Sequence, residues 1–554
     1  MEIGIQLDRI GSDISSWDKD SFAENKNKFE KIINQINLIK DKITLGGGEN
    51  KIQKQHDKGR LTARERILHL IDSKSDFLEV GIMAGYEMYN EFGSPAAAGV
   101  VAGIGKILNH DCMIIANDAT VKAGAYFEIS LSKTLHCQKI ALQNNLPVIY
   151  LVDSAGIFLP LQNQVFAGEQ HFGRIFYNNA RMSALGITQI ACVMGPCVAG
   201  GAYLPVMCDK YIIVEGASMF LAGPALVKAA IGQEVDQETL GGAETHSSIS
   251  GTTDYHVKDD LSAISKIKDI ISSVNFNQKK FMNVDSYVDN YFEKQDLLGI
   301  FNPANPSQYD VKEVIARIID DSKFMEFKSS FGKTIICGNA KIGGYSVGIV
   351  ANQKLIDKNY RGELQMGGVI YSESADKASR FIMNCNQDRI PIIFIHDVNG
   401  FMVGKDSEWG GIAKDGAKMV NAVSNSVVPK ITLITGGSYG AGNYAMSGRS
   451  YESRFVYAWP SSKIAVMGGD QAAKTLLQIN LSKKGAIDKE IKDEMYKKIK
   501  SRYDQQSDIK YAAARLWVDE VIDPRDTRRI FIRSLEIINN QEKCPSPKFG
   551  VFQV

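Results

Sequence analysis

The chain has 554 residues, of which 44% are hydrophobic and 23% are charged. These proportions are those of a folded globular protein and exclude a chain that is disordered, collagen-like or coiled-coil throughout. The 64 Lys and Arg residues balance 63 Asp and Glu residues, giving a net charge of +1. This charge provides no general attraction to nucleic acid or to an acidic membrane.

The eight cysteines form no C-x-x-C pair. They are typical of small buried hydrophobes in a reducing compartment. The N-terminal sequence MEIGIQLDRI shows neither the basic nor the apolar segment of a signal peptide. We therefore expect a cytoplasmic protein, or a mitochondrial matrix protein if the chain is a mature eukaryotic form.

The first predicted element is an amphipathic helix over residues 22–43, where apolar side chains recur every three or four positions. Three glycines at 46–48 are expected to end it. Packing of this helix on its own domain is favoured over a role as a lid or as a docking helix for a partner.

Four segments then recur in the same order in the second half of the chain. The pairs are RILHLIDSKSDF with VIARIIDDSKF, IIAN with IVAN, LPVIYLVDSAG with IPIIFIHDVNG, and ITQIACVMGPCVAGGAY with VPKITLITGGSYGAGNY. One match would carry no weight, but four in order predict an internal duplication. The proline-containing stretch 299–308 suits a linker between the halves.

Within each half, short apolar runs alternate with helical patterns, such as a helix over 131–143 and a strand over 148–152. This alternation predicts an α/β fold whose sheet is covered by helices on both faces. The uncharged run 187–208 contains prolines and glycines, so a strand, a glycine turn and a helix start are favoured over a membrane span. We expect an N-terminal helix region (1–58) and two homologous domains (59–300 and 301–554).

Several common catalytic motifs are absent from the sequence. There is no G-x-x-x-x-G-K-[ST] phosphate loop, no G-x-G-x-x-G after a strand and no H-E-x-x-H, and the histidines lack metal-ligand spacing. No metal site is predicted. A serine hydrolase using Ser154 and His171 is disfavoured because the G-x-S-x-G elbow is missing.

Two glycine-rich strand-to-helix turns remain, at 195–201 and 436–442. A helix that begins at such a turn presents unpaired N–H groups and the positive end of its dipole, which together stabilise an oxyanion. The alternative is that the glycines only permit close packing of helix on strand. Because the turns are equivalent in a duplicated chain, they favour two oxyanion holes and a reaction with two enolate-like partners.

At this point the sequence resembles the carboxyltransferase (β) subunit of biotin-dependent acyl-CoA carboxylases, over about residues 25–535. It is most similar to the 3-methylcrotonyl-CoA carboxylase branch. The motifs that carry the resemblance are GRLTARERILHLID (59–72), HFGRIFYNNARMS (171–183), CVAGGAYLPVMCD (197–209), FLAGPALVKAAIGQEV (220–235), LGGAETH (240–246), GFMVG (400–404), GIAKDGAKMV (411–420) and SYGAGNYAMSGR (438–449).

The resemblance implies two crotonase-like domains of the ClpP/crotonase superfamily in a hexamer, with the N-terminal domain binding acyl-CoA and the C-terminal domain binding carboxybiotin. It places the thioester oxygen on the amides of Gly200 and Gly201, and the ureido oxygen of biotin on those of Ala441 and Gly442. Release of CO2 from carboxybiotin would free a ureido nitrogen to take the acidic proton of the acyl-CoA, whose enolate then attacks the CO2. No side chain need act as the base.

The resemblance also suggests further binding residues. An acyl pocket is expected at Ser154, Ala155 and Gly156, with an ordinary turn as the alternative. A biotin site is expected at Asn399, Gly400, Phe401 and Tyr444. CoA phosphates are expected at Arg60, Arg64 and Lys122, with a solvated charge or a structural ion pair as the alternative.

The chain contains neither an ATP-binding phosphate loop nor a biotinyl A-M-K-M motif. The resemblance therefore implies that biotin is carried by a separate α subunit with biotin carboxylase and biotin carrier domains. Neither nucleic acid nor a membrane is expected as a partner. The alternatives left open are a propionyl-CoA-type carboxyltransferase, the acyl-CoA decarboxylase subunit of a biotin-dependent sodium pump, and a non-catalytic assembly scaffold.

Overall fold

The computed structural model describes residues 7–72, 77–274, 280–304, 308–359, 361–484, 489–541, 544–551 and 553. The chain divides into two compact units. The N-terminal unit comprises Leu38–Lys279 and Ala514–Leu516; the C-terminal unit comprises Met1–Asn37, Lys280–Ala513 and Trp517–Val554. The change of unit precedes the stretch expected to be the linker, because Leu298 and Phe301 are already buried in the C-terminal unit.

The N-terminal unit contains an eight-stranded sheet in the order β1-β2-β3-β4-β5-β6-β8, with β7 also paired to β5. Strands β1 to β3 are antiparallel, and β3, β4, β5, β6 and β8 are parallel. The bounds are β1 Leu78–Glu79, β2 Val100–Ile107, β3 His110–Asn117, β4 Val148–Ser154, β5 Gln189–Val198, β6 Lys210–Val214, β7 Ser218–Phe220 and β8 Tyr255–Val257.

The C-terminal unit repeats this sheet strand for strand, in the order β9-β10-β11-β15-β17-β18-β20 with β19 also paired to β17. The bounds are β9 Met325–Phe327, β10 Ile335–Ile342, β11 Tyr345–Asn352, β15 Ile392–Val398, β17 Lys430–Tyr439, β18 Phe455–Ala458, β19 Lys463–Ala465 and β20 Glu520–Val521. Two small ribbons pair β12 Asp357–Lys358 with β13 Leu364–Gln365, and β14 Val369–Ile370 with β16 Gly400–Phe401. The α/β fold predicted from the duplicated sequence is confirmed.

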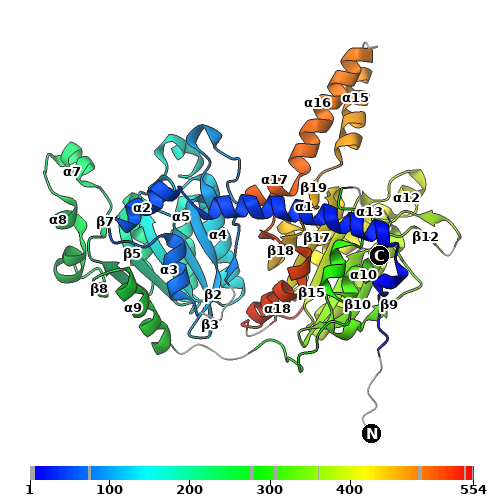
Figure 1. Cartoon of the computed structure of the whole chain (residues 1–554), viewed down its shortest axis with the longest axis horizontal. Helices are drawn as coiled ribbons and strands as arrows, with labels where there is room; N and C mark the ends of the chain where they lie inside the picture. The colour runs from blue at the N-terminus through cyan, green and yellow to red at the C-terminus, as the bar shows by residue number, and fades with distance from the viewer. Residues whose placement is uncertain are drawn as a thin grey trace, which may run out of the picture. The chain divides into compact units, whose positions relative to one another are not determined.

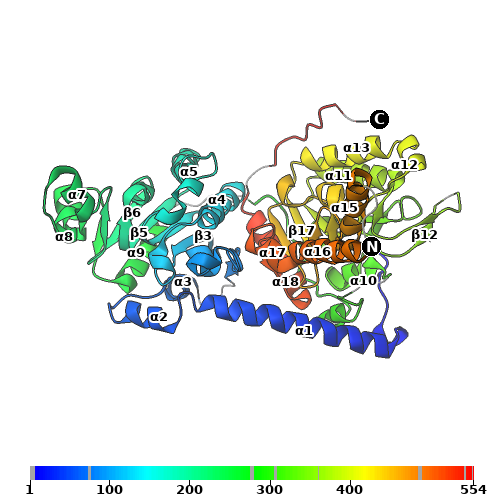
Figure 2. The same cartoon turned by 90° about the horizontal axis from the view of Figure 1, so that it is seen from above.

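Helices cover both faces of the N-terminal sheet: α4 and α5 lie on one side, and α3 and α9 on the other (Figure 2). In the C-terminal unit, α11 and α13 pack together over the equivalent face. The remaining bounds in the N-terminal unit are α2 Glu49–His56, α3 Ala63–Leu70, α4 Glu128–Gln143, α5 Phe172–Ala184, α6 Tyr203–Val206, α7 Pro224–Ile231, α8 Gln237–Gly241 and α9 Asp260–Ser273. Those in the C-terminal unit are α10 Val311–Ala316, α11 Ser372–Asp388, α12 Lys405–Trp409, α13 Ile412–Ser424, α14 Gly440–Ala445, α15 Gly469–Lys484, α16 Lys489–Ser507, α17 Ile509–Ala514 and α18 Thr527–Ile538.

The predicted N-terminal helix is present as α1, Lys19–Thr44, and runs from the C-terminal unit into the N-terminal unit. In the C-terminal unit its Phe29 is fully buried, with its ring 5.5 Å from that of Phe301 and 6.3 Å from that of Trp459. These edge-on aromatic contacts show that the first part of the helix packs within the C-terminal unit, whereas the expectation was that the whole helix packs on one domain of its own.

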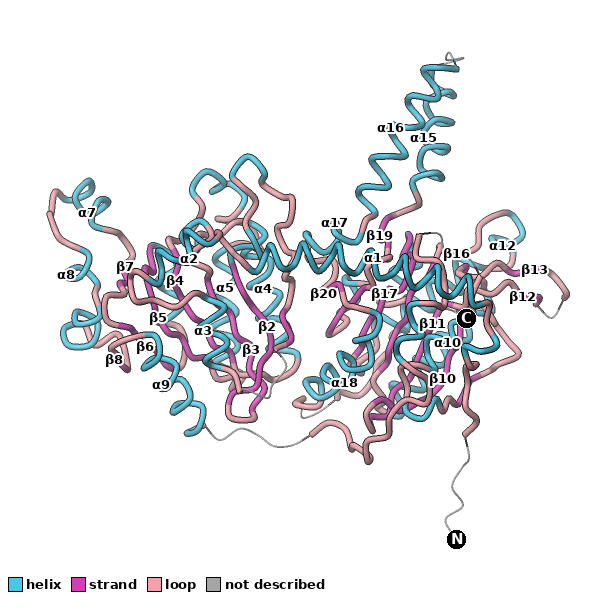
Figure 3. Tube along the Cα trace, viewed as in Figure 1, coloured by secondary structure: helices cyan, strands magenta, loops and turns pink. Residues whose placement is uncertain are grey.

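Each unit has one further feature of note, a projecting helix pair in the C-terminal unit and an uncharged segment in the N-terminal unit. Helices α15 and α16 pack side by side and project from the rest of that unit (Figures 1 and 3). The uncharged run 187–208, in the N-terminal unit, forms β5, a short turn of helix over Ala199–Ala202 and α6, as predicted. Among the described residues, no helix combines the length and the apolar character needed to cross a membrane.

Candidate active site

Each unit has the same irregularity where its central strands approach the glycine-rich turn. Val152 pairs with Val193 and Ser154 with Cys197, so a step of two residues in β4 faces a step of four in β5. In β15 and β17, His396 pairs with Ile434 and Val398 with Ser438, which is the same two-against-four step. A bulge therefore precedes both turns, at the carboxyl ends of parallel strands, where α/β folds place their sites.

A buried carboxylate faces the bulge in the N-terminal unit. Asp153 pairs with Arg66 through Oδ2 and Nη1, 3.0 Å apart, and Arg66 Nε reaches Asp260 Oδ2 at 2.8 Å. Arg66 Nη2 also donates to the carbonyl oxygen of Met194, inside the bulge, at 3.3 Å. Burial raises the pKa of Asp153, an effect that the adjacent guanidinium opposes.

The C-terminal unit has an equivalent carboxylate with different partners. Asp397 Oδ1 accepts a hydrogen bond from the amide of Gly437 and pairs with Lys354 Nζ, both at 2.9 Å. The hydroxyl of Tyr309 donates to Asp397 Oδ2 at 3.1 Å. Burial raises the pKa of Tyr309 well above its ordinary value, so it remains a hydrogen-bond donor.

These carboxylates explain two of the motif glycines. A Cβ at position 195 would lie 2.0 Å from Asp153 Oδ1, and a Cβ at position 436 would lie 2.5 Å from Asp397 Oδ1. No side chain fits at either position. Gly195 and Gly436 therefore make room for a carboxylate of the neighbouring strand, which is a packing role other than the helix-on-strand packing weighed from the sequence.

Gly201 differs from those two glycines. It lies with Gly200 in the short helical turn Ala199–Ala202 that follows β5, and a Cβ at position 201 would meet nothing within 4 Å. The protein itself thus leaves open space at Gly201. A ligand could therefore approach the backbone at Gly201 without meeting another side chain.

The second turn is continued by α14. Ala441 and Gly442 fall in its first turn, where backbone N–H groups have no acceptor within the helix. A Cβ at Gly442 would lie 2.6 Å from Val398 Cγ2 and 3.3 Å from the Cα of Gly400. Glycine at this position therefore lets the start of α14 pack directly on the end of β15.

The loops after β4 and β15 hold the other predicted binding residues. Ser154 Oγ donates to the carbonyl of Gly124 at 2.7 Å and accepts from the amide of Gly156 at 3.1 Å, and Gly156 has φ +88°. The amide of Asn399 donates to the carbonyl of Gly368 at 2.7 Å. Both loops are thus held by hydrogen bonds beside their turns; Ala155 and Asn399 are exposed, and Gly400 and Phe401 are half-buried.

An aromatic cluster lies below the first loop. The ring of Phe158 stacks on Phe127 with centroids 4.4 Å apart and meets Phe92 edge-on at 5.2 Å. Tyr89 completes the cluster at 5.2 Å from Phe127. Phe158 is therefore part of a packed apolar layer, which also includes Leu516 from the far end of the chain.

A cavity of about 350 Å³ adjoins α14 in the C-terminal unit. Gly440, Asn443 and Tyr444 contribute to it from α14, and Val466 and Trp517 from other segments. Tyr444 is half exposed, and its ring lies 5.8 Å from that of Tyr451. Of the predicted biotin residues, Tyr444 thus lines this cavity, whereas Asn399, Gly400 and Phe401 are not among its lining residues.

The three predicted phosphate-binding cations have varied surroundings. Arg64 forms two hydrogen bonds of 2.9 Å with the carboxylate of Glu79, a structural ion pair of the kind weighed as the alternative. Arg60 donates to the carbonyl of Gly216 at 2.8 Å. Lys122 is exposed in a strained turn with φ +48°.

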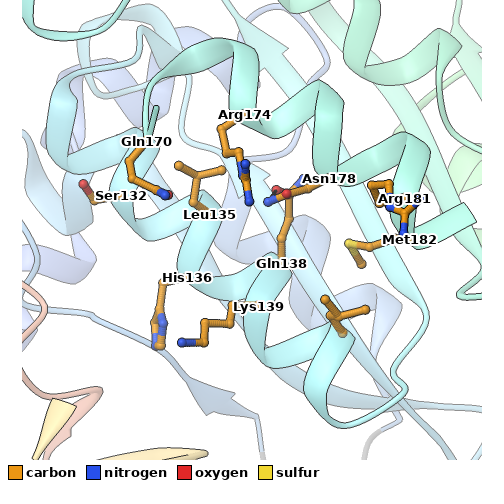
Figure 4. A pocket seen from close by; sticks show the side chains of 11 residues that line it. Ser132, Leu135, His136, Gln138, Lys139, Gln170, Arg174, Asn178, Arg181 and Met182 are labelled. Carbon is orange, nitrogen blue, oxygen red and sulfur yellow. Dashed lines mark hydrogen bonds between the residues drawn. The ribbon is translucent and has the colours of Figure 1, made fainter. Parts of the chain in front are cut away.

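A separate groove of about 530 Å³ lies between α4 and α5 (Figure 4). None of the predicted site residues lines it. Gln138, on its floor, donates to Tyr150 Oη at 3.0 Å and accepts from Asn178 Nδ2 at 3.0 Å. The first bond joins α4 to β4 and the second joins α4 to α5, so the groove floor is a structural network.

Sequence reasoning missed the buried groups behind the turns. Besides Asp153 and Asp397, these are Asn117 and Asn352, at the equivalent ends of β3 and β11. Both asparagines are buried, and the structure gives no hydrogen-bond partner to either Nδ2 among the described residues. Asn352 Oδ1 accepts from the amide of Asp397 at 3.3 Å. The signal available was that IIAN and IVAN recur, together with an Asp in each LPVIYLVD-type strand.

Two homologous α/β units, each with a glycine turn at the carboxyl end of its central strands, define a protein of the crotonase-like class. The Carboxyl transferase domain matches residues 54–552. The chain is 46% identical to the methylcrotonoyl-CoA carboxylase β chain of Dictyostelium discoideum over 97% of this chain and 90% of that protein. It is 44% identical to a biotin-dependent 3-methylcrotonyl-coenzyme A carboxylase β1 subunit of Mycobacterium tuberculosis over 96% and 98%.

Among solved structures, the β subunit of Pseudomonas aeruginosa geranyl-CoA carboxylase matches with a TM-score of 0.86 and 35% identity, covering 99% of both chains. The chain therefore belongs to the carboxyl transferase family, as the motifs of both halves indicated.

Proposed function

We propose that the chain is the carboxyltransferase subunit of a biotin-dependent acyl-CoA carboxylase, and that its acceptor is 3-methylcrotonyl-CoA. The observation that carries the proposal is the repetition of one arrangement in both units: a bulge, a buried carboxylate and a glycine turn that opens a helical segment. The relatives named for 3-methylcrotonyl-CoA match at 44–46% identity over nearly the whole chain, which supports this acceptor.

In this proposal the amides of Gly200 and Gly201 bind the thioester oxygen and stabilise the negative charge that develops there when the acyl group loses a proton. Open space at Gly201 supports this role. Ser154 and Gly156 shape the adjacent loop. Arg64 is held by Glu79. The CoA phosphates are therefore assigned to exposed Lys122 and to Arg60, which donates to a backbone carbonyl.

The surroundings of α14 fit a biotin ring. The amides of Ala441 and Gly442 are at the start of a helix, and the next two residues of that helix, Asn443 and Tyr444, line a cavity. Carboxybiotin bound there supplies both the CO2 and a basic nitrogen. The chain's own contribution is to stabilise negative charge on the ureido oxygen through these amides and to exclude water from the reacting carbon.

The proposal includes partners. Biotin would be carried by a separate α subunit, and the chain would assemble with copies of itself, expected to form a hexamer. Helix α7 supports self-association: none of its described residues is buried, and its apolar side chains Leu226 and Ile231 are exposed.

The test is carboxylation by the chain reconstituted with its biotinylated partner. Acyl-CoA-dependent incorporation of labelled bicarbonate is measured for 3-methylcrotonyl-, propionyl-, geranyl- and acetyl-CoA. The highest kcat/KM is expected for 3-methylcrotonyl-CoA. A higher value for another thioester contradicts the proposed acceptor, and a carboxylated partner that transfers to none of them contradicts the proposed activity.

A further inference from the structure

A buried carboxylate lies at the equivalent position of both halves, at the end of a central strand. Asp153 and Asp397 lie one residue before the ends of β4 and β15, and both are almost completely buried. Burying a charge is costly unless it is paired and hydrogen-bonded. Two such charges at equivalent points of a duplicated chain therefore indicate a shared task.

In the C-terminal unit, the hydrogen bonds of Asp397 connect β15 to the bulge in β17. The register of β15 and β17 breaks opposite Asp397, and the amide of Gly437 within the break donates to the carboxylate at 2.9 Å. The side chain thus supplies the acceptor that the interrupted ladder does not. Lys354 balances the charge at 2.9 Å and also reaches Asn399 Oδ1 at 3.5 Å, in the next loop.

In the N-terminal unit the carboxylate is also connected to the bulged strand, but through an arginine side chain instead of a backbone amide. The residue equivalent to Gly437 is Pro196, which has no N–H to satisfy. Arg66 instead joins Asp153 to the bulge, with one nitrogen 3.0 Å from the carboxylate and another 3.3 Å from the Met194 carbonyl. A carboxylate is thus connected to the bulged strand in both units, directly in one and through a guanidinium in the other.

The bulge determines where each turn begins. Pairing resumes at Cys197 and at Ser438, and the turns with Gly201 and Gly442 follow within a few residues. In the C-terminal unit, α14 packs on Val398, the residue directly after Asp397. A shift of the bulged strand would therefore move the amides relative to the loop they face.

We propose that Asp153 and Asp397 are positioning residues, each holding one glycine turn in register with the strand end beside it, so that each governs one half of carboxyl transfer. The inference rests on the proposed function. It assigns Asp153 to use of the acyl-CoA and Asp397 to use of carboxybiotin, and neither carboxylate contacts a substrate.

The test uses the isosteric variants Asp153→Asn and Asp397→Asn in the reconstituted holoenzyme. The partner is first carboxylated with labelled bicarbonate and freed of ATP. Loss of label without acyl-CoA then reports on the C-terminal unit, and the KM and kcat of transfer to 3-methylcrotonyl-CoA report on the N-terminal unit. Asp397→Asn is expected to slow the loss of label about 10- to 100-fold, the cost of a misplaced reacting group, with the KM for acyl-CoA unchanged. Asp153→Asn is expected to impair transfer by a similar factor without slowing the loss of label.

The matched control is Asp320→Asn. Asp320 is also buried, pairs with Arg528 at 2.8 Å and accepts the amides of Gly343 and Gly344, but it lies at the β10–β11 turn. It is expected to lower Tm and leave both reactions unchanged per folded molecule. Equal loss of both reactions in either Asp variant, no loss in either, or the same losses in Asp320→Asn overturns the inference.

Removing one partner of a buried ion pair can prevent folding. If the Asp→Asn variants do not fold, two milder variants test the same positioning roles. Tyr309→Phe removes one hydrogen bond from Asp397 but keeps its charge pair, and Arg66→Lys keeps a cation beside Asp153 but not the fork that also reaches Met194. The same split between the reactions is expected, in smaller degree. A wild-type holoenzyme that transfers to no acyl-CoA contradicts the proposed function instead, so the two failures are distinguishable.

Discussion

Glycine occurs repeatedly in the two turns, but for different physical reasons. At Gly195 and Gly436 a side chain would overlap a buried carboxylate, and at Gly442 it would overlap Val398. At Gly201 the protein offers no obstacle at all. Sequence alone cannot separate these cases, because a packing glycine and a ligand-facing glycine look the same. The difference can be tested by substitution.

Gly201→Ala is expected to leave Tm unchanged, because its Cβ enters open space. In the proposed reaction the methyl group would displace the thioester oxygen from the amide that donates to it. Losing one such hydrogen bond to the oxyanion costs ~3 kcal/mol, or ~100-fold in rate. The measurement is kcat/KM for 3-methylcrotonyl-CoA beside a thermal unfolding curve. An unchanged kcat/KM in this variant would contradict the proposal that the turn at Gly201 binds the thioester oxygen. Gly195→Ala is the contrast, since there a large loss of Tm is expected.

Gly442→Val is expected to abolish carboxyl transfer while leaving acyl-CoA binding intact, because its effect is confined to the C-terminal unit. Its Cβ would lie 2.6 Å from Val398 Cγ2, so α14 must move away from β15. Overpacking of this kind costs ~1–3 kcal/mol of stability. Acyl-CoA binding is measured by calorimetry and transfer by label. A variant with wild-type turnover contradicts the role proposed for this turn.

At the scale of elements, His396 links three segments around the second turn. From β15, its Nδ1 lies 3.0 Å from Ser438 Oγ in β17, and its Nε2 lies 2.5 Å from the carbonyl of Met446, just after α14. The Nε2–H donates to that carbonyl, and the hydroxyl donates to Nδ1. Burial lowers the pKa of His396 from 6.5 to about 4, so the ring is neutral in the folded protein at neutral pH.

The lowered pKa of buried His396 predicts that the stability of the folded protein depends on pH. Because the folded pKa is the lower one, the unfolded chain binds the extra proton, and stability falls as pH drops below 6.5 towards 4. At about pH 5.5 the loss from this group is ~1.4 kcal/mol relative to about pH 7.5. His396→Gln keeps a donor but cannot titrate, so its Tm in the same interval should fall less than that of the wild type. Equal slopes for the two proteins would show that His396 does not titrate as described.

Some elements of the fold could be predicted from the sequence, and others could not. The helix over residues 22–43 and the strand over 148–152 follow from apolar periodicity, and the structure confirms both. The bulges do not follow from it, because an extra residue pair leaves the apolar pattern of β5 and β17 intact. The buried pairing of Asp153 does not follow from it either, because Asp153 pairs with Arg66, which also pairs with Asp260, and the three residues are distant in sequence.

At the scale of the whole molecule, duplication was readable because four segments recur in order, and the two sheets repeat strand for strand. Which chain segments belong to each unit could not be predicted fully from the sequence. The N-terminal unit includes Ala514–Leu516, more than 230 residues beyond its main segment, 514 being 235 beyond 279. The Ala514 carbonyl accepts the amide of Gly85 at 2.9 Å, and Leu516 packs beside Phe127 and Leu161. A three-residue contact of this kind leaves no periodic pattern.

The N-terminal unit should therefore depend on a residue outside the half of the sequence that encodes it. Leu516→Ala is expected to cost ~2–5 kcal/mol, the usual range for a buried leucine, and to lower the Tm of the N-terminal unit. Leu185→Ala is the matched control, because Leu185 belongs to the same unit but is exposed, and substitutions of that kind change stability by only ~0.5 kcal/mol. Calorimetry of the full chain, with 3-methylcrotonyl-CoA added to mark the transition of the N-terminal unit, measures both. If Leu516→Ala behaves like the control, residues 514–516 are not part of that unit's core, and a chain ending near residue 300 should fold as well as the intact unit.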